Sequence, residues 1–132
     1  MNSSILRKVD CIRLFVPDLD EALAFYRDQL GLGLVWRSAT AIGLHLPETD
    51  AELVLQKERN VIEVDFLVNS ADQAASDFEK AGGTIVVAPF EIQIGRCAVV
   101  HDPWGNELVL LDLSKGRLQT DEAGNIVGNI MP

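Results

Sequence analysis

The chain repeats one pattern of residues, and this repeat restricts the folds that it can adopt. An apolar stripe that begins at Leu19 recurs 52 positions later, beginning at Ala71. The tetrapeptide Glu-Leu-Val-Leu at residues 52–55 recurs at residues 107–110. Matches that keep the same order over about 50 residues indicate two similar structural units. We therefore expect a duplicated module.

Each repeat carries the signals of a strand followed by a helix. Residues 9–16 and 61–68 alternate between apolar and polar side chains, which is the period of a half-buried strand. Asp18 and Ser70 follow as helix N-caps, each with Glu or Gln three residues later. The stripe of the first helix is predicted to continue through Tyr26 to Leu30, so that all of it packs on a core.

Glycine ends each predicted helix, and three strands follow it. Gly31 and Gly82 suit the left-handed conformation that closes a helix. Pro89 is expected in a loop between two strands, because proline has no N–H to donate to a sheet. The expected strands are residues 33–38, 41–46, 52–57, 84–88, 95–101 and 106–112. The order βαβββ, found twice, predicts an α+β fold.

The last two strands of the second repeat are predicted to form a hairpin around Asp-Pro-Trp-Gly-Asn. Asp102-Pro103 begins a turn, and Gly105 permits the positive φ that turns the chain back. The tail after this hairpin is polar. Asp121–Asn125 is either a small turn between short strands or part of an extension that lies on the body or on a neighbouring subunit, and the extension is preferred. The predicted organisation is one domain at 1–113, with modules at about 8–59 and 60–113, and a C-terminal extension at 114–132.

Composition narrows the class of protein. The 132 residues are 48% hydrophobic, as expected of one globular domain. A net charge of −9 argues against a nucleic-acid partner, which needs a basic face. No apolar run reaches the length of about 20 residues that a membrane helix needs, and the start has no apolar signal core. Cys11 and Cys97 form no disulfide framework, which favours the reducing cytoplasm.

Two motifs resemble a known family. Residues 16–31, Val-Pro-Asp-Leu-Asp-Glu-Ala-Leu-Ala-Phe-Tyr-Arg-Asp-Gln-Leu-Gly, and residues 102–106, Asp-Pro-Trp-Gly-Asn, resemble the vicinal oxygen chelate superfamily. This is the group of glyoxalase I, bleomycin resistance proteins and extradiol dioxygenases. The resemblance implies that the two modules curl into an open, incomplete barrel around a cavity, often in a homodimer. Many members bind a divalent metal there.

The resemblance also places the metal ligands of the family on four positions of this chain. They fall on the first and last strand of each module, at Cys11, Val54, Glu63 and Val109. Valine donates no electron pair to a metal, so the pattern disfavours a metal cofactor. Glu52 and Glu107 face the same side as the two valines by strand parity, and a shift in register would place one of them in a ligand position.

Strand parity groups further candidate residues. Cys11, Arg13 and Phe15 share one face of the first strand, and Glu63 and Asp65 share the matching face of its repeat. Arg13 and Asp65 occupy equivalent positions, so they form either an ion pair between the modules or a polar site for a ligand. Glu63 beside Asp65 is either a general base with a raised pKa or a carboxylate satisfied by Arg13.

The remaining candidates also have two interpretations. Cys11 is either a nucleophile or a small buried side chain, and Trp36 either stacks on a ligand ring or packs on the sheet. An inward-pointing Arg96 would bind a carboxylate or phosphate. His45 and His101 are expected to be structural. The predicted ligand-binding residues are Cys11, Arg13, Trp36, Glu52, Glu63, Asp65, Arg96, Glu107 and Val109, with Glu63 as the catalytic candidate.

Taken together, these residues predict a protein of the glyoxalase and bleomycin-resistance type. It would bind a small organic molecule in the cavity of the paired modules, without the metal of the family. The alternative is a metal-dependent lyase or isomerase of glyoxalase type, with an altered ligand set and Glu63 or a shifted glutamate as base. Whether the chain is an enzyme is left open. The expected partners are a small molecule and a second copy of the chain.

Overall fold

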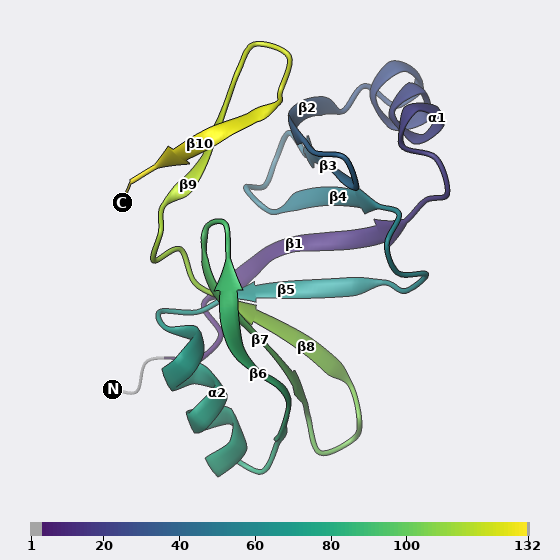
Figure 1. Ribbon diagram of the computed structural model, residues 1–132. Coiled ribbons are helices and arrows are strands. Elements are labelled where there is room, and N and C mark those ends of the chain that lie inside the picture. The colour runs from purple at the N-terminus through teal and green to yellow at the C-terminus, as the bar shows by residue number, and fades with distance from the viewer. Residues whose placement is uncertain (1–3, 132) are drawn as a thin grey trace. The chain divides into compact units, whose positions relative to one another are not determined.

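The computed structural model describes residues 4–131 (Figure 1). The chain forms two compact units. We call residues 10–63 with 118–128 the first module, and residues 64–117 with 4–9 and 129–131 the second module. Each contains the core of one sequence repeat. Within residues 4–131, no helix is long and apolar enough to cross a membrane.

The first module contains a strand, a helix and three further strands. The sheet order is β2-β3-β4-β1, with β1 parallel to β4 and the other neighbours antiparallel. A π-helical segment, η1, continues directly from α1. The elements are β1 (Lys8–Phe15), α1 (Leu19–Leu23), η1 (Ala24–Gln29), β2 (Gly33–Arg37), β3 (Ala41–His45) and β4 (Glu52–Gln56).

The second module has the same connectivity. Its sheet order is β5-β8-β7-β6, so the first strand again pairs in parallel with the last. The elements are β5 (Glu63–Leu67), α2 (Ala71–Lys80), β6 (Thr84–Ile92), β7 (Gly95–His101) and β8 (Glu107–Leu111). The prediction of an α+β fold with two βαβββ modules is confirmed.

Local capping chemistry begins both helices. The Asp18 carboxylate accepts a hydrogen bond from the Glu21 N–H at 2.9 Å, and the Ser70 hydroxyl accepts one from the Gln73 N–H at 3.1 Å. Each bond satisfies an N–H that has no partner inside its helix. The predicted N-caps are therefore confirmed.

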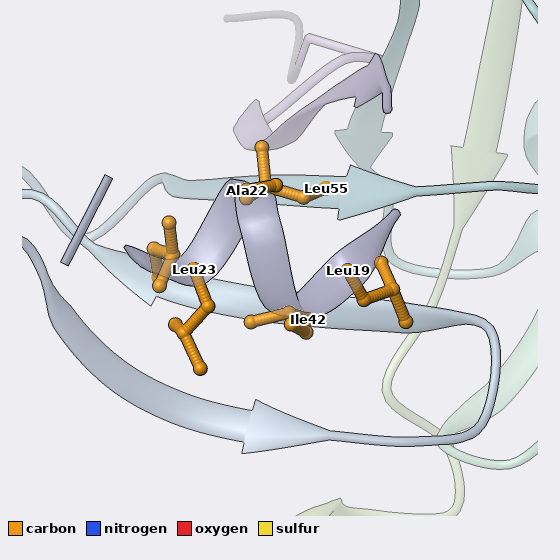
Figure 2. Close-up of a cluster of buried hydrophobic side chains, with 6 residues drawn as sticks. Leu19, Ala22, Leu23, Ile42 and Leu55 are labelled. Atoms are coloured by element: carbon orange, nitrogen blue, oxygen red, sulfur yellow. The ribbon is translucent and has the colours of Figure 1, made fainter. Parts of the chain in front are cut away.

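The helix of the first module covers one face of its sheet. Leu19, Ala22 and Leu23 of α1 are buried against the strands (Figure 2). Their partners are Ile42 and Leu44 of β3 and Leu55 of β4. Because successive side chains of a strand point to opposite faces, the residues between these partners point away from α1. That second face carries the candidate site described below.

The first helix departs from the predicted stripe after Leu23. From Ala24 the helix widens, and the Leu30 N–H donates to the carbonyl of Phe25, five residues earlier. The extra residue in this turn rotates the following side chains around the helix axis. Leu30 is 55% exposed, so its predicted place in the core is wrong.

Pro89 lies inside a strand, which corrects the prediction of a loop. β6 runs from Thr84 to Ile92 and is the last strand in the order of the second module. Its pairing with β7 shifts register between Val87 and Phe90. Proline is tolerated on such an edge strand, because the missing N–H falls at an irregular place in the ladder.

The predicted hairpin at Asp102–Asn106 joins β7 to β8. Asp102 accepts hydrogen bonds from the N–H groups of Trp104 and Asn106, both at 2.9 Å. Gly105 has a φ of 89°, a conformation that glycine adopts without strain. Trp104 at the tip is 84% exposed.

The C-terminal residues form a second hairpin, of β9 (Arg117–Thr120) and β10 (Ile126–Ile130). Its turn repeats the chemistry of Asp102, because Asp121 accepts hydrogen bonds from the N–H groups of Ala123 and Asn125. The Gly124 carbonyl of this turn accepts a hydrogen bond of 2.7 Å from the Arg37 N–H of β2. The structure thus has the turn between short strands, the less favoured of the two predicted alternatives, and this turn contacts β2 of the first module.

Candidate functional site

The face of the first module's sheet that points away from α1 carries several predicted site residues. We call it the open face. In the register of the sheet, Glu52 of β4 lies opposite Cys11 of β1 on one side and His45 of β3 on the other. The three positions therefore form one row across three strands. The next row contains Arg13 and Val54.

A bulge in β2 brings Trp36 to the open face. Leu34 packs on the α1 side, and two residues later Trp36 packs with Cys11 and Val54. Residues two apart normally share a face, but the pairing of β2 with β3 shifts register between Leu34 and Trp36. The bulge explains how both side chains are accommodated.

Trp36 is held by two neighbours. Its indole Nε1 donates a hydrogen bond of 2.7 Å to Oε1 of Glu52. Its ring occupies the space where a Cβ of residue 43 would lie, so only glycine fits at Gly43. The aromatic ring is therefore fixed against the sheet, and a fixed ring needs little further ordering when a ligand binds.

Glu52 has an altered acidity. Burial raises the pKa of its carboxyl above the ordinary value; the hydrogen bond from Trp36 and the proximity of His45 oppose the rise, and the negative charge of Asp10 adds to it. A carboxyl with a raised pKa holds its proton more readily, which suits a group that donates and accepts protons.

Glu63, the predicted catalytic residue, contacts two guanidinium groups. Its Oε2 lies 3.4 Å from Nε of Arg13, and its Oε1 lies 3.7 Å from Nη1 of Arg59. The Arg13 and Glu63 side chains are both more than three-quarters buried. A partly buried ion pair of this kind either stabilises the module or offers polar groups to a ligand. Asp65 is buried in β5 opposite Val109.

The four positions where the resemblance places metal ligands do not form a metal site in this structure. Cys11 and Val54 are buried in one apolar cluster, and Val109 is buried in another with Leu67 and Leu111. Valine offers no donor atom, so this set does not fit the metal of the resembled family. Within residues 4–131, no group of three or more His, Cys, Asp or Glu side chains is arranged to hold a metal ion.

Arg96 of the second module contacts a helix. Its Nε lies 2.7 Å from Oδ2 of Asp72 in α2, and its Nη2 donates to the Pro89 carbonyl at 3.1 Å. The fork of the guanidinium, predicted to bind an anionic ligand, is occupied by a carboxylate of the same module.

Glu107 occupies the same place in its module as Glu52. It lies opposite His101 in the register of β7 and β8, with 3.8 Å between Oε1 of Glu107 and Nε2 of His101. Glu107 is exposed, whereas Glu52 is half-buried. The duplicated glutamates thus differ in exposure, and Glu52 accepts a hydrogen bond from the Trp36 indole.

Asp112 and Gln56 are buried polar residues that the sequence did not single out. Asp112 is 4% exposed and accepts hydrogen bonds from the N–H groups of Ala71 and Arg96 and from the Ser114 hydroxyl. Gln56 accepts from the N–H groups at residues 58 and 59 and so closes the loop after β4. The sequence offers one signal for these two residues, which is that each polar side chain stands at the end of an apolar strand.

A family model and several solved structures are similar to this chain in sequence pattern or in fold. The family model of the Glyoxalase/Bleomycin resistance protein/Dioxygenase superfamily matches residues 8–110. No curated protein sequence matches the chain. Methylmalonyl-CoA epimerase from Mycobacterium tuberculosis has a similar structure, with a TM-score of 0.72 at 20% identity over 85% of this chain and 91% of that one.

A larger enzyme also contains this fold. Homoprotocatechuate 2,3-dioxygenase from Brevibacterium fuscum has a TM-score of 0.62 at 25% identity, over 82% of this chain and 37% of that one. An uncharacterized protein from Methanosarcina mazei has a TM-score of 0.58 at 26% identity, over 85% of this chain and 98% of that one. With two βαβββ modules, and with most of its length matched by the family model, the chain belongs to the glyoxalase, bleomycin resistance protein and dioxygenase superfamily.

Proposed function

We propose that this protein binds a small organic ligand on the open face of the first module, without the metal of the superfamily. The observation that carries the proposal is the fixed indole of Trp36 beside the half-buried carboxyl of Glu52. Ligand sites are mostly apolar, with a few placed polar groups, and this face has that composition. Trp36 provides an aromatic wall, and Glu52 provides a polar contact.

Arg13 and Glu63 extend the proposed site along the sheet. Arg13 lies two positions beyond Cys11, so a distance of about 7 Å along the strand separates the two polar rows. A ligand with polar groups at both ends matches that spacing. Participation of Asp65, Arg96, Glu107 and Val109 in binding stays a prediction.

A thermal-shift screen with small acids, amines and planar aromatic compounds tests the proposal. A ligand at 100 times its dissociation constant stabilises the folded state by about 2.7 kcal/mol, which is easily measured. Trp36→Leu should remove the stabilisation by any compound found. Trp104→Leu is the matched control, because this tryptophan is exposed at a turn. Equal loss of binding in both variants would contradict the assignment to the open face.

The metal-free form of the proposal has its own test. Purified protein is dialysed against Zn²⁺, Ni²⁺, Mn²⁺ or Fe²⁺ and then analysed for bound metal. Substoichiometric metal, and ligand binding that survives a chelator, are the expected results. Stoichiometric metal that is lost in Glu63→Gln would instead favour the metal-dependent lyase or isomerase.

The raised pKa of Glu52 favours a second candidate function. A carboxyl that exchanges protons near a bound ligand can act as the base of a lyase or isomerase. Small carbonyl compounds incubated with the protein in D₂O would then gain deuterium, followed by NMR. Glu52→Gln should abolish the exchange and Glu107→Gln should leave it unchanged. Exchange that persists in Glu52→Gln excludes this glutamate as the base.

We also propose that the protein is a cytoplasmic homodimer. Val86, Val87 and Phe90 on the edge strand β6 are each at least 40% exposed, which suits a surface that a second copy covers. Two cysteines, Cys11 and Cys97, are too few for the disulfide framework of a small secreted domain, which favours a reducing compartment. Sedimentation equilibrium measures the mass in solution, and a monomer at all concentrations would exclude the dimer.

A further inference from the structure

A groove in the first module lies beside the π-helical segment η1. Its volume is about 370 Å³, and its walls come from the end of β1, from η1 and from the loop after β4. It is lined by Leu14, Phe15, Tyr26, Asn60, Val61 and Ile62. All six are uncharged at neutral pH, in contrast with the open face, where Arg13, Glu52 and Glu63 lie.

One wall of the groove is shaped by the π-helical segment. A π-turn is a rare departure from the α-helix and is frequent at functional sites. Here it leaves Phe25 53% exposed, with its ring packed edge-on against Tyr26 at 5.2 Å between centroids. An unbroken α-helix would continue the buried stripe. The π-helical segment that contributes Tyr26 to the groove therefore leaves apolar side chains such as Phe25 exposed.

Gln56 fixes the loop that forms another wall of the groove. Its side-chain oxygen accepts hydrogen bonds of 2.8 Å from the Glu58 N–H and 2.9 Å from the Arg59 N–H. This closes the loop that leads into Val61 and Ile62. Ile62 is 74% exposed and its neighbour Val61 is 39% exposed, so this wall presents two apolar side chains to solvent.

We propose that this groove is a second binding site, for one small, neutral, largely apolar molecule with a single hydrogen-bonding group. The volume lies at the lower end of the range for small-molecule pockets, about 300–1,000 Å³. The Asn60 amide and the Tyr26 hydroxyl supply the polar contact, and the uncharged lining selects a neutral ligand.

Titration with N-phenyl-1-naphthylamine, a neutral probe with three aromatic rings and one N–H, tests the site by fluorescence and by amide NMR shifts. One equivalent should bind, with shifts confined to residues 14–15, 25–30 and 60–62. Ile62→Ser should weaken binding about tenfold, the effect of losing one apolar side chain that covers the probe. Ile130→Ser is the matched control, because Ile130 is also exposed and lies outside the groove. Asn60→Ala should weaken binding without changing the unfolding transition.

Three results would overturn the proposal. The first is failure of the wild-type protein to bind the probe, and the second is equal weakening by Ile62→Ser and Ile130→Ser. The third is a dependence of the same NMR shifts on protein concentration without probe, which would assign the groove to a second copy of the chain. Glu52→Gln should leave probe binding unchanged, so failure of the open-face proposal is separable from failure of this one.

Discussion

Trp36 keeps its position only because residue 43 lacks a side chain. The indole fills the space of the missing Cβ at Gly43, and it then reaches Glu52 with its Nε1. Gly33 is the contrasting case on the neighbouring strand. A Cβ there would meet the Cβ of His45 at 3.9 Å, which is an ordinary contact.

Gly43→Ala should therefore displace the Trp36 ring. Forcing a methyl group into a filled site costs about 1–3 kcal/mol of unfolding free energy. We expect that loss in urea denaturation, together with a changed near-ultraviolet circular dichroism of tryptophan. Gly33→Ala should leave both measurements close to wild type. A Gly43→Ala protein with unchanged stability and spectrum would show that the ring is not held in this way.

Asp112 links stability to pH. Burial alone would raise the pKa of this carboxyl, but hydrogen bonds from the Ala71 N–H, from Ser114 and from the Arg96 N–H together lower it. A pKa that is lower in the folded than in the unfolded state stabilises the protein above the unfolded value, about 3.9 for Asp. That stabilisation is lost as the pH falls through the folded pKa.

Asp112→Asn should accordingly destabilise the protein by about 2–3 kcal/mol near pH 7, because charged hydrogen bonds are lost. The difference from wild type should be constant between pH 5 and pH 7 and should shrink below about pH 4. Guanidinium unfolding at a series of pH values measures it. Asp20→Asn, at a carboxylate that is 88% exposed, should change stability little. If the stability difference between wild type and Asp112→Asn does not vary with pH, the ionisation of Asp112 does not contribute to stability.

The first helix contains two regions that differ in how far their apolar side chains are buried. α1 buries its apolar side chains on the sheet, and η1 exposes Phe25 and Leu30. The same apolar pattern in the sequence thus has two structural outcomes. Mutations in the two regions should differ in their effect on stability.

Leu23→Ala should reduce the unfolding free energy by about 2–4 kcal/mol, since it removes buried methyl groups and leaves a cavity. Leu30→Ala should change it by no more than about 0.5 kcal/mol, as expected of an exposed position. Denaturant midpoints of the two variants give the comparison. Equal losses would mean that Leu30 is packed in the core after all, as the apolar period of the sequence predicts.

Across the whole molecule, the predictable features were those that depend on neighbours in the sequence. Periodicity located the strands, and the caps at Asp18 and Ser70 located the helix starts. The Trp36 contact to Glu52 depends on a bulge and on the register of three strands. Neither can be predicted from the residues that are adjacent in the sequence. The hydrogen bonds of Asp112 likewise join residues that are distant in the sequence, since the Ala71 N–H comes from a residue 41 positions away.

The C-terminal hairpin covers part of the edge strand β2. The Gly124 carbonyl binds the Arg37 N–H, so the turn at residues 121–125 occupies a backbone donor on the outer strand β2. Free edge strands invite pairing with other chains, and native proteins cover them. The turn requires a φ of 86° at Gly124, a conformation that costs other residues about 1 kcal/mol or more.

Gly124→Ala should strain this turn and loosen the hairpin from β2. We expect faster amide hydrogen exchange at Arg37 and a greater tendency to aggregate on heating, measured by light scattering. Gly128→Ala is the matched control, because the nearest atom to its new Cβ is the flexible end of Gln119 and its φ lies outside the left-handed region. If both variants exchange and aggregate like wild type, the hairpin does not protect the edge, and its contact with β2 is incidental to the stability of the first module.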